Sequence, residues 1–292
     1  MSSIVKKLKR LPKWLKTPLP KKKQFFKLKS LVQKYNLNTV CESASCPNIG
    51  ECWDAGTLTL MILGNSCSRA CKFCDVATGN LFPPKSDEPK QIAEILSKLN
   101  LHYAVLTSVD RDDLPDGGAE HWIKTIKMVR SLCPGMKIET LIPDFQGNMN
   151  LVEKICEAGP DVLAHNLETV KSLQHHIRPQ CRYTWSLDTL KTASFKKDLI
   201  VKSSLMLGLG EKEYEVINTM QDLVDSGCQT LSLGQYLCPS PRHTEVVEFI
   251  HPNQFLKYKQ IGESLGLAHV EAGPLVRSSY MAEQQAKAVG LF

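Results

Sequence analysis

Short apolar runs alternate with amphipathic stretches of helical length along most of the chain. Six runs rich in Val, Ile, Leu or Thr are predicted strands, at residues 58–63, 103–107, 137–142, 162–166, 201–207 and 230–235. The amphipathic stretches between them predict helices at residues 89–99, 119–132, 149–157, 184–195 and 213–226. Strand and helix in alternation indicate right-handed βαβ units on a parallel sheet. Six units predict an α/β fold, a partial (β/α)6 TIM-type barrel, because a closed barrel would need eight.

The regions outside this rhythm divide the chain into four predicted segments. Residues 1–40 form a basic N-terminal arm, and residues 41–56 form a Cys-rich extension without periodicity, expected to bind a cluster. The barrel is expected at 57–250, followed at 251–292 by a C-terminal helix, near 253–265, and a tail.

The positive charge of the chain is confined to the arm. Residues 1–40 hold twelve Lys or Arg and no acid, so the net charge of +6 leaves the body with 24 basic and 30 acidic side chains. The body is therefore mildly acidic, and nucleic-acid binding is not expected. We interpret the arm as solvated, packing its few apolar residues on the body, or as a contact for an acidic protein partner.

Two targeting features are missing from the pattern. No run approaches the roughly 18–20 apolar residues of a membrane-spanning helix, and the N-terminus has no apolar signal-peptide core. We therefore expect a cytoplasmic protein with no membrane partner, and a monomer by default.

Three of the eleven cysteines follow the first predicted strand closely. Cys67, Cys71 and Cys74 form a CxxxCxxC spacing with Phe73 before the last cysteine. Three thiolates hold three irons of a [4Fe-4S] cube and leave the fourth iron open. An open iron can chelate S-adenosylmethionine (SAM), and an electron passed to the sulfonium then generates a 5′-deoxyadenosyl radical. This spacing is typical of radical SAM chemistry.

Other readings of the same spacing fit less well. A zinc site usually pairs CxxC with a second pair of Cys or His, and a ferredoxin uses CxxCxxC with a fourth cysteine. The position also favours a catalytic role, because barrel enzymes carry their chemistry in loops after the strands.

Polar groups after other strands are candidate contacts for SAM. Gly117 and Gly118 follow the second predicted strand, where a chain without Cβ atoms can bring its carbonyls close to an ammonium group. Asn166 and Glu168 end the fourth strand, and Arg178 lies just beyond; these groups suit ribose hydroxyls and a carboxylate. An ordinary turn and an exposed polar loop remain open as alternatives.

A second group of cysteines precedes the first strand. Cys41, Cys46 and Cys52 lie within twelve residues in a loop-like context, and we interpret them as ligands of a second cluster. An isolated cysteine is usually a small apolar side chain, and we assign that role to the other five: Cys133, Cys156, Cys181, Cys228 and Cys238.

The two cysteine groups belong to a longer series of motifs. CxxxxCPNxxECW is followed by MILGxxCxxxCxFCDV, TSVDRDDLPDGGA, LIPDF and RSSY, and this order resembles the lipoyl synthase family across residues 41–281. The resemblance implies that a serine of RSSY is the fourth ligand of the second cluster. We take Ser279, with Ser278 as its competitor; Met281 departs from the family, which usually has His there.

The resemblance also implies a reaction. Lipoyl synthases insert sulfur at C6 and C8 of a protein-bound octanoyl chain; such unactivated carbons need a radical, which a cofactor must supply. The cofactors implied are SAM and two [4Fe-4S] clusters, the second being the sulfur donor. The partners implied are an octanoylated lipoyl carrier domain or H protein, and a flavodoxin- or ferredoxin-type reductant. An acidic carrier would suit the basic arm, and deletion of residues 1–34 would test that contact.

Two other functions remain as alternatives. A tRNA methylthiotransferase also carries three additional cysteines, usually together with an RNA-binding domain. A non-enzymatic iron-sulfur protein would need neither a SAM pocket nor a barrel.

Overall fold

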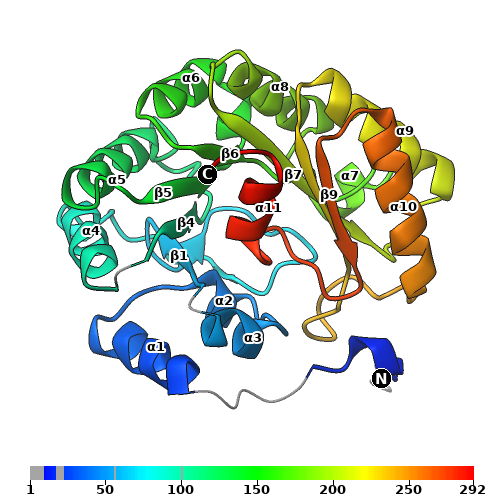
Figure 1. Ribbon diagram of the computed structural model, residues 1–292, viewed down its shortest axis with the longest axis horizontal. Helices are drawn as coiled ribbons and strands as arrows, with labels where there is room; N and C mark the ends of the chain where they lie inside the picture. The colour runs from blue at the N-terminus through cyan, green and yellow to red at the C-terminus, as the bar shows by residue number, and fades with distance from the viewer. Residues whose placement is uncertain (1–9, 18–22, 56, 100) are drawn as a thin grey trace.

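A curved, all-parallel sheet organises the molecule, and Figure 1 shows it in the computed structural model of the chain. The structure describes residues 10–17, 23–55, 57–99 and 101–292; the rest of the predicted arm lies outside these residues. Seven strands of the described part form the sheet in the order β1 (Thr59–Ile62), β4 (Tyr103–Ser108), β5 (Lys137–Leu141), β6 (Val162–Ala164), β7 (Ile200–Leu207), β8 (Thr230–Gln235) and β9 (His269–Gly273). The edge strands β1 and β9 do not pair, so the barrel is partial, as predicted.

Helices cover the outer face of the sheet (Figure 1). They are α4 (Glu88–Leu99), α5 (Ala119–Leu132), α6 (Met149–Glu157), α8 (Tyr183–Ser194), α9 (Glu213–Asp225) and α10 (Pro252–Leu265). Their ends, and those of β1 and β4 to β8, lie within two residues of the predicted ones. The agreement follows because apolar residues recur at helical spacing on one face of each helix, and strands buried on both faces are apolar throughout.

The sheet extends further along the chain than the sequence pattern indicated. Strand β9 pairs with β8 from Thr230 opposite His269 to Gly234 opposite Gly273. The prediction of six strands, with the barrel ending at residue 250, missed this seventh strand. Its sequence HVEAG contains one β-branched residue and only one fully buried position, so it does not read as a core strand.

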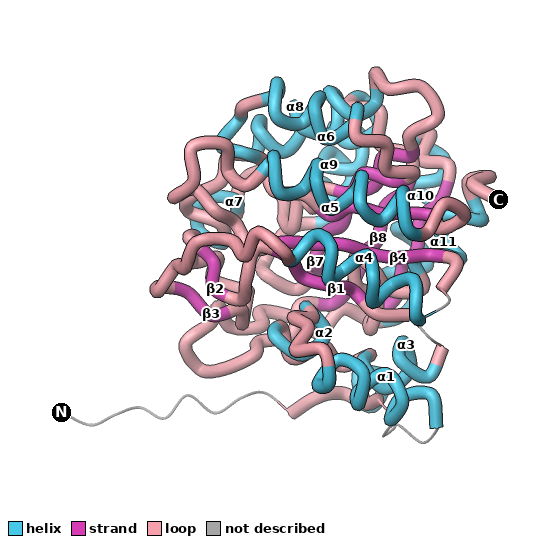
Figure 2. Tube along the Cα trace, turned by 90° about the vertical axis from the view of Figure 1, so that its left-hand side faces the viewer, coloured by secondary structure: helices cyan, strands magenta, loops and turns pink. Residues whose placement is uncertain are grey.

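The C-terminal tail closes one end of the barrel. Helix α11 (Ala282–Ala288) lies inside the curve of the sheet (Figure 1), and Figure 2 places it at the end opposite β2 (Ser66–Cys67) and β3 (Ala77–Thr78). Ala282 and Ala286 pack against Tyr103, Val162 and Ile200, each of which is the first residue of its strand. The N-terminal ends of the strands are thus filled, and the opposite end is left for a site.

The described part of the N-terminal region packs beside the barrel. It comprises η1 (Lys13–Leu15), α1 (Lys23–Lys34), α2 (Val40–Ser43) and α3 (Ile49–Asp54). Phe25, Leu28 and Val32 of α1 are buried, and the Phe25 ring lies 5.5 Å from that of Trp53. The helix therefore buries its apolar side chains on the body, while lysines such as Lys27 stay exposed.

Two short elements complete the C-terminal end of the barrel, η2 (Phe145–Gly147) and α7 (Gln174–Ile177). No helix among the described residues has both the length and the apolar character needed to cross a bilayer.

Candidate functional site

A cavity of about 520 Å³ opens at the C-terminal end of the barrel and receives both cysteine groups. Five of the six motif cysteines line it, together with both serines of RSSY: Cys41, Cys46, Cys67, Cys71, Cys74, Ser278 and Ser279. A second hollow, of about 640 Å³ and lined by residues such as Lys137 and Val289, contains none of these groups. The chemistry predicted from sequence thus converges on one end of the barrel, where parallel strands deliver their following loops.

The first cysteine loop is held by hydrogen bonds from several sides. The short β2–β3 ladder pairs Cys67 with Thr78. The Lys72 N–H donates to the Ile177 carbonyl at 2.9 Å, and the Lys72 carbonyl accepts from the Thr244 N–H at 2.9 Å. These contacts fix the loop that carries all three cysteines before any metal is bound.

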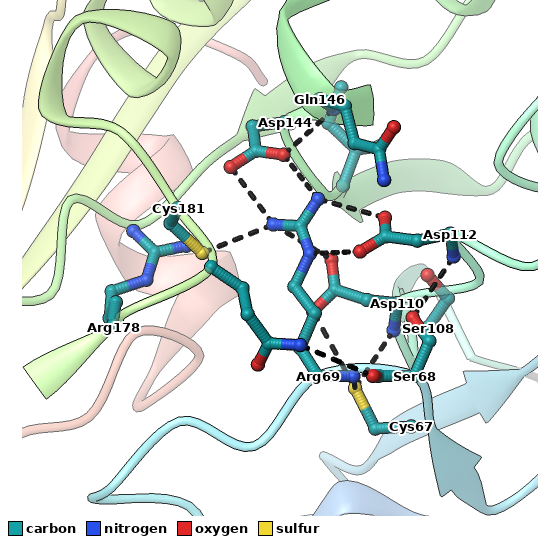
Figure 3. Close-up of polar contacts among 12 residues, drawn as sticks. Cys67, Ser68, Arg69, Ser108, Asp110, Asp112, Asp144, Gln146, Arg178 and Cys181 are labelled. Atoms are coloured by element: carbon teal, nitrogen blue, oxygen red, sulfur yellow. Dashed lines mark hydrogen bonds and ion pairs between the residues drawn. The ribbon is translucent and has the colours of Figure 1, made fainter. Parts of the chain in front are cut away.

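Arg69, inside the cysteine motif, is the buried centre of an ionic network (Figure 3). Its guanidinium donates to both carboxylate oxygens of Asp112 at 2.7 and 2.9 Å, and to both of Asp144 at 3.0 and 2.7 Å. It also donates to the Cys181 sulfur at 3.1 Å and lies 3.5 Å from Asp110. Because these partners follow β4, β5 and α7, Arg69 ties the cysteine loop to three other loops.

The network changes the acidity of its members. Burial disfavours the charged form of Asp144, but hydrogen bonds and charge from Arg69 outweigh it and lower its pKa. For Asp110, burial raises the pKa more than Arg69 lowers it. Burial and the neighbouring Asp110 raise the pKa of the Cys67 thiol to about 12. Burial raises the pKa of Cys74 to about 11. Both thiols are therefore protonated at neutral pH, and metal binding would have to displace their protons.

The second cysteine group lies on the two short helices before β1 and on the segment between them, which carries Cys46. Cys41 lies in α2, which Thr39 caps by accepting from the Glu42 N–H at 3.3 Å, and the Cys46 N–H donates to the Cys41 carbonyl at 3.0 Å. Cys52 lies in α3; burial and the nearby Cys46 and Cys41 raise the pKa of its thiol to about 12. The three thiols are thus close enough to influence one another electrostatically, although Cys52 does not line the cavity.

The RSSY segment reaches this group from the other end of the chain. Thr59, at the start of β1, donates to the Ser279 hydroxyl at 2.9 Å. A Cβ on Gly234 would lie 1.9 Å from the Val276 carbonyl oxygen, so only glycine allows the segment to pack against β8. Met281 has a left-handed backbone (φ 48°) where α11 begins, and its backbone hydrogen-bonds to Cys52.

The predicted SAM contacts separate into two sets. Asn166, Glu168 and Arg178 all line the cavity. Asn166 donates to Glu168 at 3.0 Å, and Arg178 donates to the Asn166 carbonyl at 3.1 Å. Two buried atoms there, Asn166 Oδ1 and Arg178 Nε, have no hydrogen-bond partner. Unsatisfied polar groups on a cavity wall fit a polar ligand.

Gly117 and Gly118 are not among the lining residues, so the structure does not bring them to this cavity. Both have positive φ at the turn into α5. Added Cβ atoms would lie 2.9 Å from Phe145 at Gly117 and 2.6 Å from Leu63 at Gly118. The alternative of an ordinary turn therefore accounts for them.

Sequence reasoning missed several residues at this end of the barrel. Arg69 was inside the motif, but nothing in its spacing indicated the carboxylates it binds. His165 lines the cavity between the Ile142 carbonyl at 2.8 Å and Ser186 at 2.9 Å, and burial lowers its pKa to about 4. Cys181, expected to be core packing, instead contacts Arg69. Cys238 also lines the cavity.

The donor set fits clusters better than a single ion. Within the described residues, no three His, Cys, Asp or Glu side chains converge to hold one metal ion. A [4Fe-4S] cube takes each thiolate on a different iron, so its ligands stand apart around it. Five thiols that line one cavity, with Cys52 close enough to interact electrostatically with Cys41 and Cys46, are compatible with that requirement.

Comparison with known sequences identifies close relatives. A family model for the radical SAM superfamily matches residues 61–223, and one for the N-terminal domain of lipoyl synthase matches residues 3–46. The chain is 50% identical over 273 residues to the mitochondrial lipoyl synthase of Nematostella vectensis, covering 94% of each. It is 49% identical over 279 residues to the lipoyl synthase of Thermus thermophilus, covering 94% of this chain and 85% of that one.

Solved structures share the fold at low sequence identity. HydG, a maturase of the [FeFe]-hydrogenase, has a TM-score of 0.57 at 14% identity, with 72% of this chain and 49% of HydG covered. SuiB of Streptococcus suis bound to SAM has a TM-score of 0.53 at 11% identity, with 73% and 49% covered. These likenesses support the partial barrel.

Proposed function

The chain belongs to the lipoyl synthase family of the radical SAM superfamily, and from that membership we infer that the cavity receiving both cysteine groups is its active site. The protein is a radical SAM enzyme that inserts sulfur at C6 and C8 of a protein-bound octanoyl chain, with SAM and two [4Fe-4S] clusters. The observation that carries the assignment is the arrival of five motif cysteines and both RSSY serines at one cavity.

We assign the first cluster to Cys67, Cys71 and Cys74. All three cysteines line the cavity, and three thiolates leave one iron of a [4Fe-4S] cube for a further ligand. Asn166, Glu168 and Arg178 would bind SAM beside it, through the unsatisfied Asn166 oxygen and Arg178 nitrogen and the Glu168 carboxyl group. With SAM, this cluster supplies the carbon-centred radical and the second supplies sulfur.

We assign the second cluster to Cys41, Cys46, Cys52 and Ser279. The Thr59 hydroxyl donates to the Ser279 oxygen, so that oxygen stays hydrogen-bonded when it gives up its own proton to bind iron. Ser278 lines the same cavity and remains the competitor. A serine ligand is weaker than a fourth thiolate for iron, which suits a cluster that must release sulfur.

The octanoyl chain would lie between the two groups. Apolar side chains on the cavity wall, including Met61, Leu141 and Met206, suit an alkyl chain and exclude water from it. A cavity that excludes water protects a radical from side reactions. These residues would thereby position the two reacting carbons between the radical source and the sulfur donor.

We propose that the four segments predicted from sequence divide this work, with the barrel extended to include β9. The substrate is a lipoyl-accepting protein, proposed to be an octanoylated carrier domain or H protein. A flavodoxin- or ferredoxin-type protein would supply electrons, and we propose a cytoplasmic monomer without nucleic-acid or membrane partners. Neither alternative function is favoured by an observation in the structure.

The proposed contact between the basic arm and the carrier protein needs a test that leaves the packing of α1 intact, which deletion does not. Removing residues 1–34 would also remove α1 and uncover Trp53, against which Phe25 packs. Charge reversal of exposed Lys27 and Lys29 keeps the helix packing. We expect the double variant to bind an acidic carrier more weakly than the unaltered protein does at low salt. The difference in affinity should shrink at high salt, because salt screens exposed charges. Unchanged binding at low salt would remove the arm from the proposal.

Anaerobic reconstitution tests the function directly. Protein loaded with iron and sulfide is expected to hold about eight irons, and with reductant, SAM and an octanoylated peptide to form 5′-deoxyadenosine and a thiolated peptide. Cys41→Ala should keep deoxyadenosine formation and lose sulfur insertion, whereas Cys71→Ala should lose both. Cys156→Ala, at a cysteine buried in α6, is the matched control. About four irons in the unaltered protein, with deoxyadenosine but no sulfur transfer, would refute lipoyl synthesis.

A further inference from the structure

Cys181 is a fourth thiol at the first cysteine loop. It follows α7 in a turn closed by its own N–H to the Arg178 carbonyl at 3.0 Å, and its side chain is buried. The sulfur accepts a hydrogen bond from Arg69 at 3.1 Å (Figure 3), and the thiols of Cys181 and Cys71 are close enough to interact electrostatically. This cysteine therefore lies near a proposed cluster ligand.

The backbone holds the two cysteines side by side. On one side of Cys71, the Ala70 N–H donates to the Gln180 side-chain oxygen at 2.7 Å. On the other, the Lys72 N–H donates to the Ile177 carbonyl at 2.9 Å. The segments 70–72 and 177–181 thus run together through contacts independent of either sulfur. Such proximity is the condition for a disulfide that needs little backbone movement.

Two other thiols that line the cavity with Cys71 are engaged elsewhere. Cys67 donates to the Asp110 carboxylate at 3.6 Å and accepts from the N–H groups of Arg69 and Asp110 at 3.5 and 3.3 Å. Cys238 donates to the Ser240 carbonyl at 3.0 Å. The adjoining backbone segments favour Cys181 as the partner of Cys71 when no cluster is bound, and Cys74, whose N–H donates to the Cys71 carbonyl at 3.1 Å, is its competitor.

We propose that Cys71 and Cys181 form a reversible disulfide when cluster-free protein meets peroxide. The sulfur of Cys71, which faces the cavity, attacks one peroxide oxygen to give a sulfenic acid and one water. The Cys181 sulfur then attacks the sulfenic sulfur and expels the second water, so two thiols lose two electrons and hydrogen peroxide is reduced to two waters. The disulfide withdraws Cys71 from iron and shields it from irreversible oxidation until a thiol reduces the bond.

Peptide mapping of the full-length, cluster-free protein tests this. After treatment with hydrogen peroxide and alkylation of remaining thiols, trypsin places Cys71 on residues 70–72 and Cys181 on 172–182, apart from Cys67 on 35–69 and Cys74 on 73–85. We expect 70–72 joined to 172–182 as the main disulfide, in the unaltered protein and in the Cys156→Ala control. Linkage of Cys71 mainly to another cysteine, or Cys71 recovered as free thiol after peroxide has oxidised the others, would overturn the proposal.

Iron loading provides the second readout. This inference rests on the proposed function in treating Cys71 as a cluster ligand. Peroxide-treated protein should take up about four fewer irons until dithiothreitol is added. Cys181→Ala, oxidised in the same way, should not recover, because its Cys71 passes to sulfinic acid. Full iron uptake by the disulfide-linked protein would overturn the proposal. Absence of SAM cleavage by reconstituted protein would instead refute the proposed function and leave the mapped disulfide unaffected.

Discussion

Replacing one buried carboxylate tests how the cysteine loop is held. Asp144 has no exposed side-chain surface and accepts two hydrogen bonds from Arg69. Asp144→Asn removes the charge and one strong acceptor while keeping the shape, so Arg69 retains only Asp112 as a bidentate partner. Breaking a buried ion pair costs roughly 3–5 kcal/mol. Because Asn still accepts one bond, we expect the free energy of unfolding to fall by about 3 kcal/mol, the lower end of that range.

The chain contains a matched control. Asp113 also makes a bidentate pair, with Arg111 at 2.9 and 2.8 Å, but its side chain is 31% exposed. Exposed pairs contribute about 1 kcal/mol or less. Asp113→Asn is therefore expected to lower the free energy of unfolding by about 1 kcal/mol at most. Both variants would be compared with the parent protein by denaturant unfolding of the cluster-free chain.

The pH dependence of the unfolding free energy further distinguishes the buried pair of Asp144 from the exposed pair of Asp113. Because the folded-state pKa of Asp144 is lowered, its stabilising contribution is present above the ordinary Asp value near 4 and is lost as pH falls through the folded value. The gap in unfolding free energy between the parent protein and Asp144→Asn should therefore shrink in acid. A loss no larger than that of Asp113→Asn, or a gap that stays constant from neutral pH into acid, would refute the reasoning.

Three further substitutions have defined outcomes. Ser279→Ala should lower iron content from about eight towards four and abolish sulfur insertion while keeping SAM cleavage; the same result from Ser278→Ala alone would reassign the ligand. Gly234→Ala should displace the RSSY segment and destabilise the fold by about 1–3 kcal/mol in denaturant unfolding; unchanged stability and iron content would contradict the close approach. Lys202→Met leaves Glu139, 3.0 Å away and equally buried, without its cation. It should cost about 3–5 kcal/mol, part of which a second change, Glu139→Gln, restores; no loss in the single variant would contradict this.

The local pattern of apolar residues was sufficient to predict most of the long helices and strands. Strands β1 and β4 to β8 and the six long helices from α4 to α10 follow from apolar spacing, because each buries one face or both whatever its neighbours are. Strand β9 was not predicted, because most of its positions are only half-buried and its sequence is not apolar throughout. Helix α1 carries a usable signal in Phe25, Leu28 and Val32, but the surrounding lysines drew attention to charge instead.

The site residues likewise divide into those that local sequence spacing indicated and those that only the tertiary structure revealed. Cysteine spacing is local, so both groups of three were evident from sequence. The two glycines after β4 show the limit, since their positive φ indicates a turn whether or not a ligand is near. Arg69 and Cys181 required the tertiary structure, because their partners come from distant loops.

By itself, the sequence determined the strand and helix alternation, the two cysteine groups and, through the ordered motifs, the resemblance to lipoyl synthases. The tertiary structure alone decided that Ser279 lies beside Thr59, that Arg69 joins its loop to those carrying Asp112 and Asp144, and that Cys181 meets Cys71. The physical reason is that parallel strands bring all their C-terminal loops to one end of the barrel. Which of those loops then touch depends on strand order and packing, and these are set by contacts between residues far apart in the chain.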